Sequence, residues 1–284
     1  MSNSETEGRN GKTAAGSTSG GARPRVCNRA AFLAKAGTTL FGAVAAAMGL
    51  GGPAAGAGST QIGANARPVR GRDSKASVIK RWDVVTIGNL SRNRYWGESD
   101  DKAVRSAICT CTLITGDAFR LLVDPSLGDA ERMLSELDRR TGLKPRDITA
   151  VFVTHDHADH VAGVAHFPDA RWLAAPEVAA ILNGLGKLPR KVEGAAGRLW
   201  DSVEIIPTPG HTKTHHSVRF DCDGLSVVVA GDAAPTRDFF RERRGIFNSV
   251  DFEQAARTMD KIAGIADVIV PGHDNYFFID RSKR

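Results

Sequence analysis

Residues 151–160 constrain this chain more than any other segment of its sequence. Their letters are VFVTHDHADH, an apolar run that predicts a buried strand, followed directly by three histidines and two aspartates. Imidazoles this crowded repel one another when protonated, and carboxylates withdrawn from water need partners. Neutral imidazole and carboxylate together are the donors that Zn²⁺ and related divalent ions bind. The segment therefore predicts a metal site among its histidines and aspartates, in preference to a solvated polar loop.

Three later residues of the same chemical types also follow apolar runs. His211 stands in PTPGHT, Asp232 ends VVVAGD, and His273 stands in IVPGHD. Any one of them alone would more often be an ordinary loop residue. Sites in layered folds gather where strands end at one edge of a sheet, so the four segments together predict one shared site.

Hydrophobic periodicity predicts how the body of the chain folds. Alternating or continuous apolar runs predict strands, and apolar residues spaced by three and four predict helices. Gly116 and Asp117 separate two of the strands and indicate a hairpin. An early and a late group of strands, with helices between them, predict an α/β fold of two sheets sandwiched between outer helices. The expected strands are 78–90, 106–115, 119–123, 148–153, 203–206, 216–220, 225–230 and 268–270, and the expected helices are 128–140, 176–185 and 252–262.

The N-terminal part of the chain has a different character. Residues 1–57 hold a polar start and then an uncharged Ala/Gly/Leu stretch, which is typical of a signal-peptide core and short for a membrane span. The letters NRAAFL resemble a twin-arginine export signal, although Ala30 stands where the second arginine belongs. We expect residues 1–57 to be a cleaved export signal, 58–76 a linker and 77–284 the folded domain of a periplasmic or secreted protein. General secretion and a retained N-terminus are the alternatives.

The charge of the chain limits the kinds of partner that we expect, and its cysteine content indicates the state of its thiols. The net charge of the 284-residue chain is +6, but residues 1–57 hold six Lys/Arg against two Asp/Glu, which leaves 32 against 30 for the rest. A nearly neutral domain does not predict a phosphate-binding surface. We expect a small-molecule substrate, no nucleic acid and no stable membrane partner, and the sequence does not indicate the oligomeric state. Cys109, Cys111 and Cys222 are expected to be buried free thiols.

The motifs HDHADH, GHT, GD and PGH, spread over roughly residues 78–280, resemble those of the metallo-β-lactamase superfamily. The resemblance implies a four-layer αββα sandwich with two metal ions. It also implies that Asp124 orients a ligand histidine and that His215 supports the site without binding metal. Carried over residue by residue, the ligands would be His155, His157 and His211 at the first metal, Asp159, His160 and His273 at the second, and Asp232 bridging both together with a water or hydroxide.

The same resemblance implies a metal-dependent hydrolase, which the N-terminal signal would export. Its cofactors would be two divalent ions, Zn²⁺ being expected first and Fe or Mn also suiting the donors. The metals would lower the pKa of the bridging water, with Asp159 and Asp232 as catalytic carboxylates. Asp232 stands where true β-lactamases of the fold carry other residues, and only 11 residues follow His273, too few for the helical domain of glyoxalase II-like thioesterases. We therefore expect a small ester or lactone substrate, as in the loosely similar acyl-homoserine lactonases.

Three other functions stay open. A phosphodiesterase or nuclease of the same fold is favoured by a basic run at 237–244, although acidic residues interrupt it as on a solvated face. A β-lactamase-like amide hydrolase and a non-catalytic metal-binding protein are the others. The polar loop 91–105, which holds Tyr95 and Trp96, is expected to be either a wall over the metals or an ordinary surface loop.

Overall fold

The structure, a computed structural model, describes residues 77–280. These residues lie within a single unit of the chain, Gln61–Arg284. The predicted export signal (1–57) and linker (58–76) lie outside the described residues, so both stay predictions. Within the described part of the chain, no helix has the length and apolar character needed to cross a membrane.

Twelve strands of the described residues form two six-stranded sheets. In the first sheet the strands are neighbours in chain order, antiparallel from β1 to β3 and parallel from β3 to β6. In the second sheet only β10 and β11 are parallel. The first sheet comprises β1 (Ile79–Thr86), β2 (Cys111–Gly116), β3 (Arg120–Val123), β4 (Ala150–Val153), β5 (Arg171–Ala174) and β6 (Glu193–Gly194), and the second comprises, in spatial order, β12 (Phe277–Phe278), β11 (Val268–Pro271), β10 (Leu225–Gly231), β9 (His216–Cys222), β8 (Val203–Pro207) and β7 (Arg198–Leu199).

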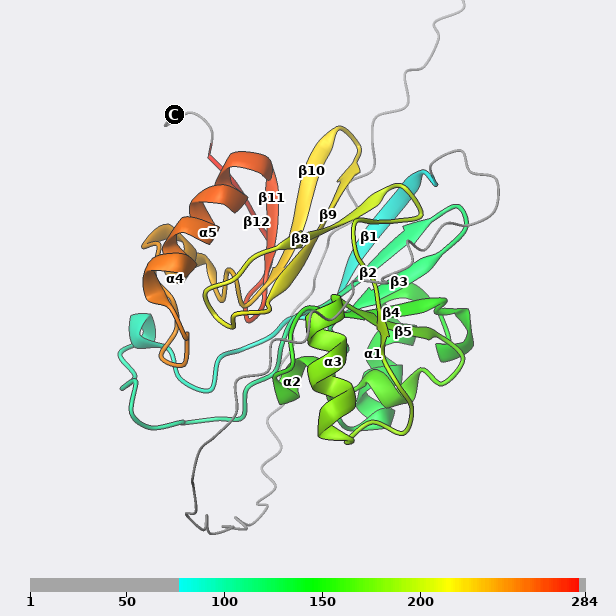
Figure 1. Cartoon of the computed structure of the whole chain (residues 1–284), viewed down its shortest axis with the longest axis horizontal. Coiled ribbons are helices and arrows are strands. Elements are labelled where there is room, and N and C mark those ends of the chain that lie inside the picture. Colours follow the sequence, from blue (N-terminus) through cyan, green and yellow to red (C-terminus); the bar gives the residue numbers. More distant parts are fainter. Residues whose placement is uncertain (1–76, 281–284) are drawn as a thin grey trace, which may run out of the picture. The chain divides into compact units, whose positions relative to one another are not determined.

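Helices cover the outer face of each sheet (Figure 1). The longer ones carry the end signals that their sequences indicate: Asp129 caps the first helix by accepting from Arg132 N, and Gly142 ends it in the left-handed conformation. Asp251 caps the last helix in the same way. The helices are α1 (Ala130–Thr141), α2 (Ala158–Val161), α3 (Pro176–Leu185), α4 (Arg237–Arg241) and α5 (Phe252–Ile265).

Three apolar cores separate four layers. β4 shows why, because its side chains alternate between two of the cores: Val151 and Val153 pack toward α1 and α3, whereas Phe152 packs toward the second sheet. The third core lies between the second sheet and α4 and α5, where Phe240 and Met259 are buried. The expected αββα sandwich is confirmed.

The strand predictions differ from the structure mainly near the loop of residues 91–105. The expected strand 78–90 ends at Thr86, and the expected strand 106–115 begins only at Cys111. Between them, Asn89 and Ile108 form an isolated bridge, and Thr110 bonds to Gly272 and Asp274 of another segment. The hydrogen-bonding groups of these residues are therefore engaged by a distant segment and by one bridge, and they do not form a regular sheet. β5, α2, α4 and the two-residue strands were not expected.

Candidate metal centre

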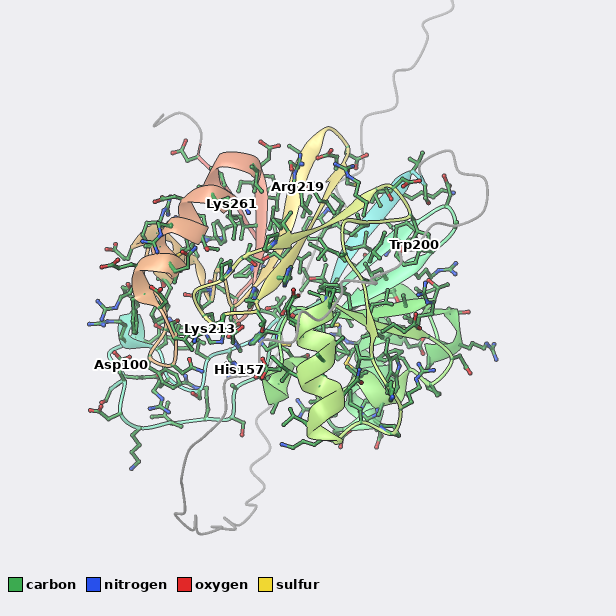
Figure 2. All side chains as sticks on the ribbon, viewed as in Figure 1. Asp100, His157, Trp200, Lys213, Arg219 and Lys261 are labelled. Atoms are coloured by element: carbon green, nitrogen blue, oxygen red, sulfur yellow. The ribbon has the colours of Figure 1, made fainter. Side chains whose placement is uncertain are left out.

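The predicted site residues follow strands that end at one edge of the sandwich. β4 leads into residues 155–157 and α2, while β10 ends directly before Asp232 and β11 ends two residues before His273. β8 runs in the same direction as β10 and leads into the turn that carries His211. Figure 2 shows His157 at this end of the sheets, opposite the end where Arg219 lies. Strand direction thus brings four distant segments together.

A first group of donors consists of His155, His157, His211 and Asp232, whose ligand atoms lie within 4.8 Å of one another. His157 Nδ1 is 3.0 Å from His155 Nε2 and 2.9 Å from His211 Nε2. A ring nitrogen carries either one proton or one lone pair, so His157 Nδ1 cannot form a normal hydrogen bond with both of these imidazoles at once. Three nitrogens and a carboxylate aimed at one point are the donor set of a divalent ion.

A second group consists of Asp159, His160 and His273, again within 4.8 Å. His273 Nε2 lies 3.6 Å from Asp159 Oδ2. Asp232 connects the two groups: its Oδ1 is 3.2 Å from His160 Nε2 and 3.1 Å from His273 Nε2, and its Oδ2 is 3.2 Å from His211 Nε2. The structure therefore brings all seven predicted ligand residues together, with Asp232 between two triads of donors.

Unpartnered buried atoms test whether these residues fit metal ions. His160 Nε2 and Asp232 Oδ1 are both buried and make no hydrogen bond within the described residues, despite their close approach. A buried polar atom without a partner costs about 1–3 kcal/mol, so folded proteins rarely tolerate several in one place. An ion bound among these atoms would satisfy them. The residues fit two divalent cations, and their role as ligands stays a prediction.

Burial and neighbouring charges shift the pKa values of the donor side chains. Burial lowers the pKa of His155 well below its usual range and that of His211 to about 4. Burial alone would raise the pKa of Asp232, but the surrounding imidazoles hold it well below its ordinary value. For His160 and His273 burial is outweighed by nearby negative groups, and their pKa is raised. His155 and His211 are therefore unprotonated at neutral pH, whereas a cation bound by His160 and His273 would displace protons.

Two of the predicted ligand histidines have their rings fixed by contacts on the side away from the site. Asp124, in a left-handed conformation with φ 51°, accepts from Thr154 N at 2.8 Å and from His160 Nδ1 at 2.8 Å. His273 Nδ1 lies 3.1 Å from Asn89 O and 3.0 Å from Ile108 O. Each bond leaves Nε2 of the ring facing the site. Asp124 thus makes the contact expected of it, and the stem of loop 91–105 supplies the equivalent contact for His273.

His215 lies behind Asp232 and does not belong to either donor group. Its Nε2 accepts the backbone N–H of Asp232 at 3.1 Å, so its proton is assigned to Nδ1, which donates to Thr208 Oγ1 at 2.9 Å. The Thr208 hydroxyl then donates to Ser217 Oγ at 2.8 Å, and Ser217 donates to Ala230 O at 3.0 Å. This fully buried relay ties Asp232 to the preceding strand. No motif in the sequence indicated Thr208 or Ser217, apart from their positions close to His211 and His215.

Loop 91–105 packs beside α4. Tyr95 meets Phe239 edge to face, with ring centroids 4.9 Å apart, and Trp96 is 57% exposed beneath the Arg105 guanidinium. Asn89 and Ile108, which flank this loop, contact His273. The role of the loop as a wall over the metals stays a prediction.

The basic run at 237–244 is partly neutralised. Arg243 pairs with Asp260 at 2.6 Å, and the Arg237 guanidinium lies over the Phe277 ring. Arg241 and Arg244 are exposed. Such a run is typical of a solvated face and does not form a continuous basic surface.

The three described cysteines are free and buried, as expected. Burial raises the pKa of the Cys109 thiol to about 12 and that of Cys111 well above its usual range. Cys109 Sγ donates to the carbonyl oxygen of Asp159 at 3.1 Å. The thiols therefore pack and orient the backbone rather than react.

Comparison with known proteins was informative at the level of the family. Residues 105–273, more than half of the chain, match the family model of the metallo-beta-lactamase superfamily. The chain is 32% identical over 174 residues to metallo-beta-lactamase domain-containing protein 1 of Mus musculus, covering 57% of this chain and 62% of that protein. It is 26% identical over 161 residues to a probable metallo-hydrolase of Methanocaldococcus jannaschii, covering 57% of this chain and 74% of that protein. It is 35% identical over 117 residues to hydroxyacylglutathione hydrolase of Xanthomonas axonopodis pv. citri, covering 39% and 41%.

The mouse relative and its human counterpart are matched over 62% and 52% of their own lengths, so this chain spans about half to two thirds of them. Among solved structures, an N-acyl homoserine lactone hydrolase with N-hexanoyl-L-homoserine at its catalytic metal centre is similar with a TM-score of 0.55 and 18% identity, covering 70% of this chain and 94% of that one. A putative metallo-beta-lactamase of Thermotoga maritima is similar with a TM-score of 0.52 and 20% identity, covering 70% and 99%. At these identities the structural likeness concerns the fold alone.

Proposed function

Because this chain belongs to the metallo-beta-lactamase superfamily, we propose that it is a metal-dependent hydrolase that uses two divalent ions to cleave a small ester or lactone. The observation that carries the proposal is the position of Asp232 between two groups of donors: its Oδ1 lies near His160 and His273 of the second group, and its Oδ2 lies 3.2 Å from His211 of the first group and 3.3 Å from His273. A site for one ion would need only one of these groups.

The proposed ligands are those expected from the sequence. His155, His157 and His211 would hold the first ion, Asp159, His160 and His273 would hold the second, and Asp232 would contribute to both sites. Nitrogen and oxygen donors without thiolate suit Zn²⁺, and they also accept Fe or Mn. When bound, the two ions supply Lewis acidity, which lowers the pKa of water and polarises the scissile carbonyl.

The chain's own side chains have separate tasks around that chemistry. Asp124 and the two carbonyls behind His273 hold the ligand rings in one tautomer. Asp159 is the site carboxylate that solvent reaches, because its side chain is 22% exposed whereas that of Asp232 is 4% exposed. Asp159 can therefore accept a proton inside the site and pass it to water or to the leaving group.

The choice of an ester or lactone rests on two supports. A carboxylate bridge at Asp232 differs from the ligand pattern of true β-lactamases, and similar proteins carry names of ester-type hydrolases, hydroxyacylglutathione hydrolase and N-acyl homoserine lactone hydrolase. The partial pairing of the 237–244 arginines gives little support to a nucleic-acid substrate.

Metal analysis coupled to a substrate panel tests the proposal. Purified protein should contain two divalent ions per chain, and it should hydrolyse a γ-lactone or an aryl ester faster than a bis-aryl phosphodiester or a β-lactam. A chelator should remove the activity, and added Zn²⁺, Fe²⁺ or Mn²⁺ should restore it. A protein that prefers the phosphodiester, or that turns over the ester equally well without metal, contradicts the proposed function.

A further inference from the structure

A hollow of about 380 Å³ opens beside the proposed metal site. We call it the trough, and three segments form its walls: residues 106–108, residues 126–132, and α2 with Ala162. Asp159, proposed above as a metal ligand and proton carrier, is one of the residues that line it. The trough is thus continuous with the site, and its volume falls within the range of small-molecule pockets.

Hydrogen bonds hold the trough open in its present form. The His166 Nε2 atom lies 3.2 Å from Leu127 O and 3.1 Å from Gly128 O, and Gly163 N donates to Pro125 O at 2.9 Å. A side chain at Gly163 would not fit, since its Cβ would lie 2.9 Å from Leu127 O. His166 therefore fixes one wall of the trough. Such preorganisation lowers the cost of binding a ligand.

The trough has apolar walls and a single cation. Its apolar side chains include Ile108, Leu127, Ala158 and Ala162. Arg132, in the first turn of α1, is exposed and is the one Lys or Arg of the lining. No ion pair or side-chain hydrogen bond is found for its guanidinium within residues 77–280.

The acids of the trough are already engaged. Asp129 Oδ1 accepts the backbone N–H of Arg132 at 2.8 Å and caps α1, and Asp159 faces His273. Neither carboxylate lies within ion-pair distance of the Arg132 guanidinium. The planar fork of an arginine matches a carboxylate in two parallel hydrogen bonds, so an anionic ligand group is the partner that Arg132 suits best.

We propose that the trough binds the acyl part of the substrate and that Arg132 binds a carboxylate at the end of that acyl chain. This inference rests on the proposed ester or lactone hydrolysis. The carbonyl to be attacked lies at the metal site, the methylene chain lies against Ile108, Leu127, Ala158 and Ala162, and the distal carboxylate meets Arg132. The substrate class is a monoester, or the related lactone, of an acid that carries a second carboxyl group.

Two aryl esters of equal chain length test the proposal. They are para-nitrophenyl hydrogen adipate, whose acyl chain ends in a carboxylate, and para-nitrophenyl hexanoate, whose chain ends in a methyl group. The full chain, loaded with metal, should prefer the adipate ester in kcat/KM. The change Arg132→Gln should lower the ratio of the two kcat/KM values by about two- to fivefold, mainly through KM, because an exposed charged pair contributes up to about 1 kcal/mol. Arg132→Lys should restore part of the ratio.

Arg139→Gln is the matched control. Arg139 lies on the same helix, pairs with Glu136 and does not line the trough, so this change removes the same charge and should leave the ratio at its wild-type value. Calorimetric titration with adipate and with hexanoate adds a readout independent of turnover. Adipate should bind the wild type more tightly, and Arg132→Gln should remove that difference.

The outcomes separate the two proposals. Hydrolysis of both esters with a ratio that Arg132→Gln leaves unchanged, or an equal fall for Arg139→Gln, overturns the role of Arg132 and leaves the hydrolase proposal standing. If the metal-loaded protein hydrolyses neither ester, ester hydrolysis itself is overturned. Calorimetry then tests the role of Arg132 independently: equal binding of adipate to the wild type and to Arg132→Gln overturns that role.

Discussion

At the scale of single residues, Asp232 lies close to both donor groups, and the charge of this side chain can be removed without changing its shape. Two close dications repel, and a carboxylate between them offsets that repulsion. Asp232→Asn should therefore release or loosen at least one ion, more readily the second, and lower kcat by about 10²–10³. Metal stoichiometry and kcat, measured on the same preparation, check this.

Asp156→Asn is the control for that change. Asp156 lies in the same loop, is partly exposed and belongs to neither donor group. It should keep both ions and its activity. An Asp232→Asn protein with two ions and full activity, or an Asp156 change that proves the more damaging, would show the ligand assignment to be wrong.

Thr208 offers a second prediction at this scale, because its hydroxyl is the middle of the buried relay behind Asp232. Thr208→Val would leave His215 Nδ1 and Ser217 Oγ without the partner they now share. We expect a loss of about 1–3 kcal/mol in the free energy of unfolding, the cost of buried groups left unsatisfied. Urea unfolding of the metal-free protein measures it, and Thr208→Ser should recover most of the loss.

Thr212→Val is matched to it in the same turn. The Thr212 hydroxyl is buried without a hydrogen-bond partner in the described residues, so replacing it by a methyl should change the unfolding free energy little or raise it. Equal destabilisation by the two valines would mean that the relay contributes nothing specific.

At the scale of elements, the sequence predicted most clearly where hydrophobic period and end signals agreed. The helix expected at 176–185 is α3, and the hairpin at Gly116 and Asp117 joins β2 and β3. β5 was missed because only Arg171–Ala174 pair, a run too short to show a period. The segment 106–110 was predicted wrongly because its groups bond to Gly272 and Asp274, which lie far away in sequence.

The same distinction applies to the site. Each candidate ligand could be found because it follows an apolar run with a characteristic motif. The relay through Thr208 and Ser217, the contact of Asn89 with His273, and the support of the trough by His166 could not be found, because each depends on a register between segments distant in the chain. Local sequence has no signal for such contacts.

Close packing of β10 against the turn after β11 leads to a prediction for that turn. A Cβ on Gly272 would lie 2.1 Å from Asp232 Oδ1 and 2.9 Å from the carbonyl carbon of Gly231. Gly272→Ala should therefore displace the Asp232 carboxylate and lower metal content and kcat together. Gly184→Ala, in α3 where a Cβ would meet nothing within 4 Å, should keep both and raise stability by about 0.5–1 kcal/mol. If Gly272→Ala retains the metal content of Gly184→Ala, the carboxylate is not held where we describe it.

At the scale of the whole chain, we propose that residues 1–57 direct export and are then removed. The motif Ala55-Gly56-Ala57 and a second one at 64–66 fit the small-residue pattern of cleavage sites. N-terminal sequencing of the protein from its native host should find a start near Gly58 or Arg67. A cytoplasmic protein that keeps Met1 contradicts this proposal.

In the proposed assignment the two sheets contribute different ligands to the same ions, which would link metal binding to the stability of the domain. His155, His157, Asp159 and His160 follow β4 of the first sheet, whereas His211, Asp232 and His273 follow strands of the second. An ion that binds only the folded arrangement stabilises it by about 2.7 kcal/mol at one hundred times its Kd. For a domain of this size each kcal/mol shifts Tm by about 2–4 °C, so a chelator should lower Tm by about 5–10 °C for each ion that it removes. Added Zn²⁺ should restore the Tm, and Asp232→Asn should show a smaller shift because it holds less metal. A chelated protein that is free of metal and melts at the temperature of the loaded one would mean that the ions do not join the sheets.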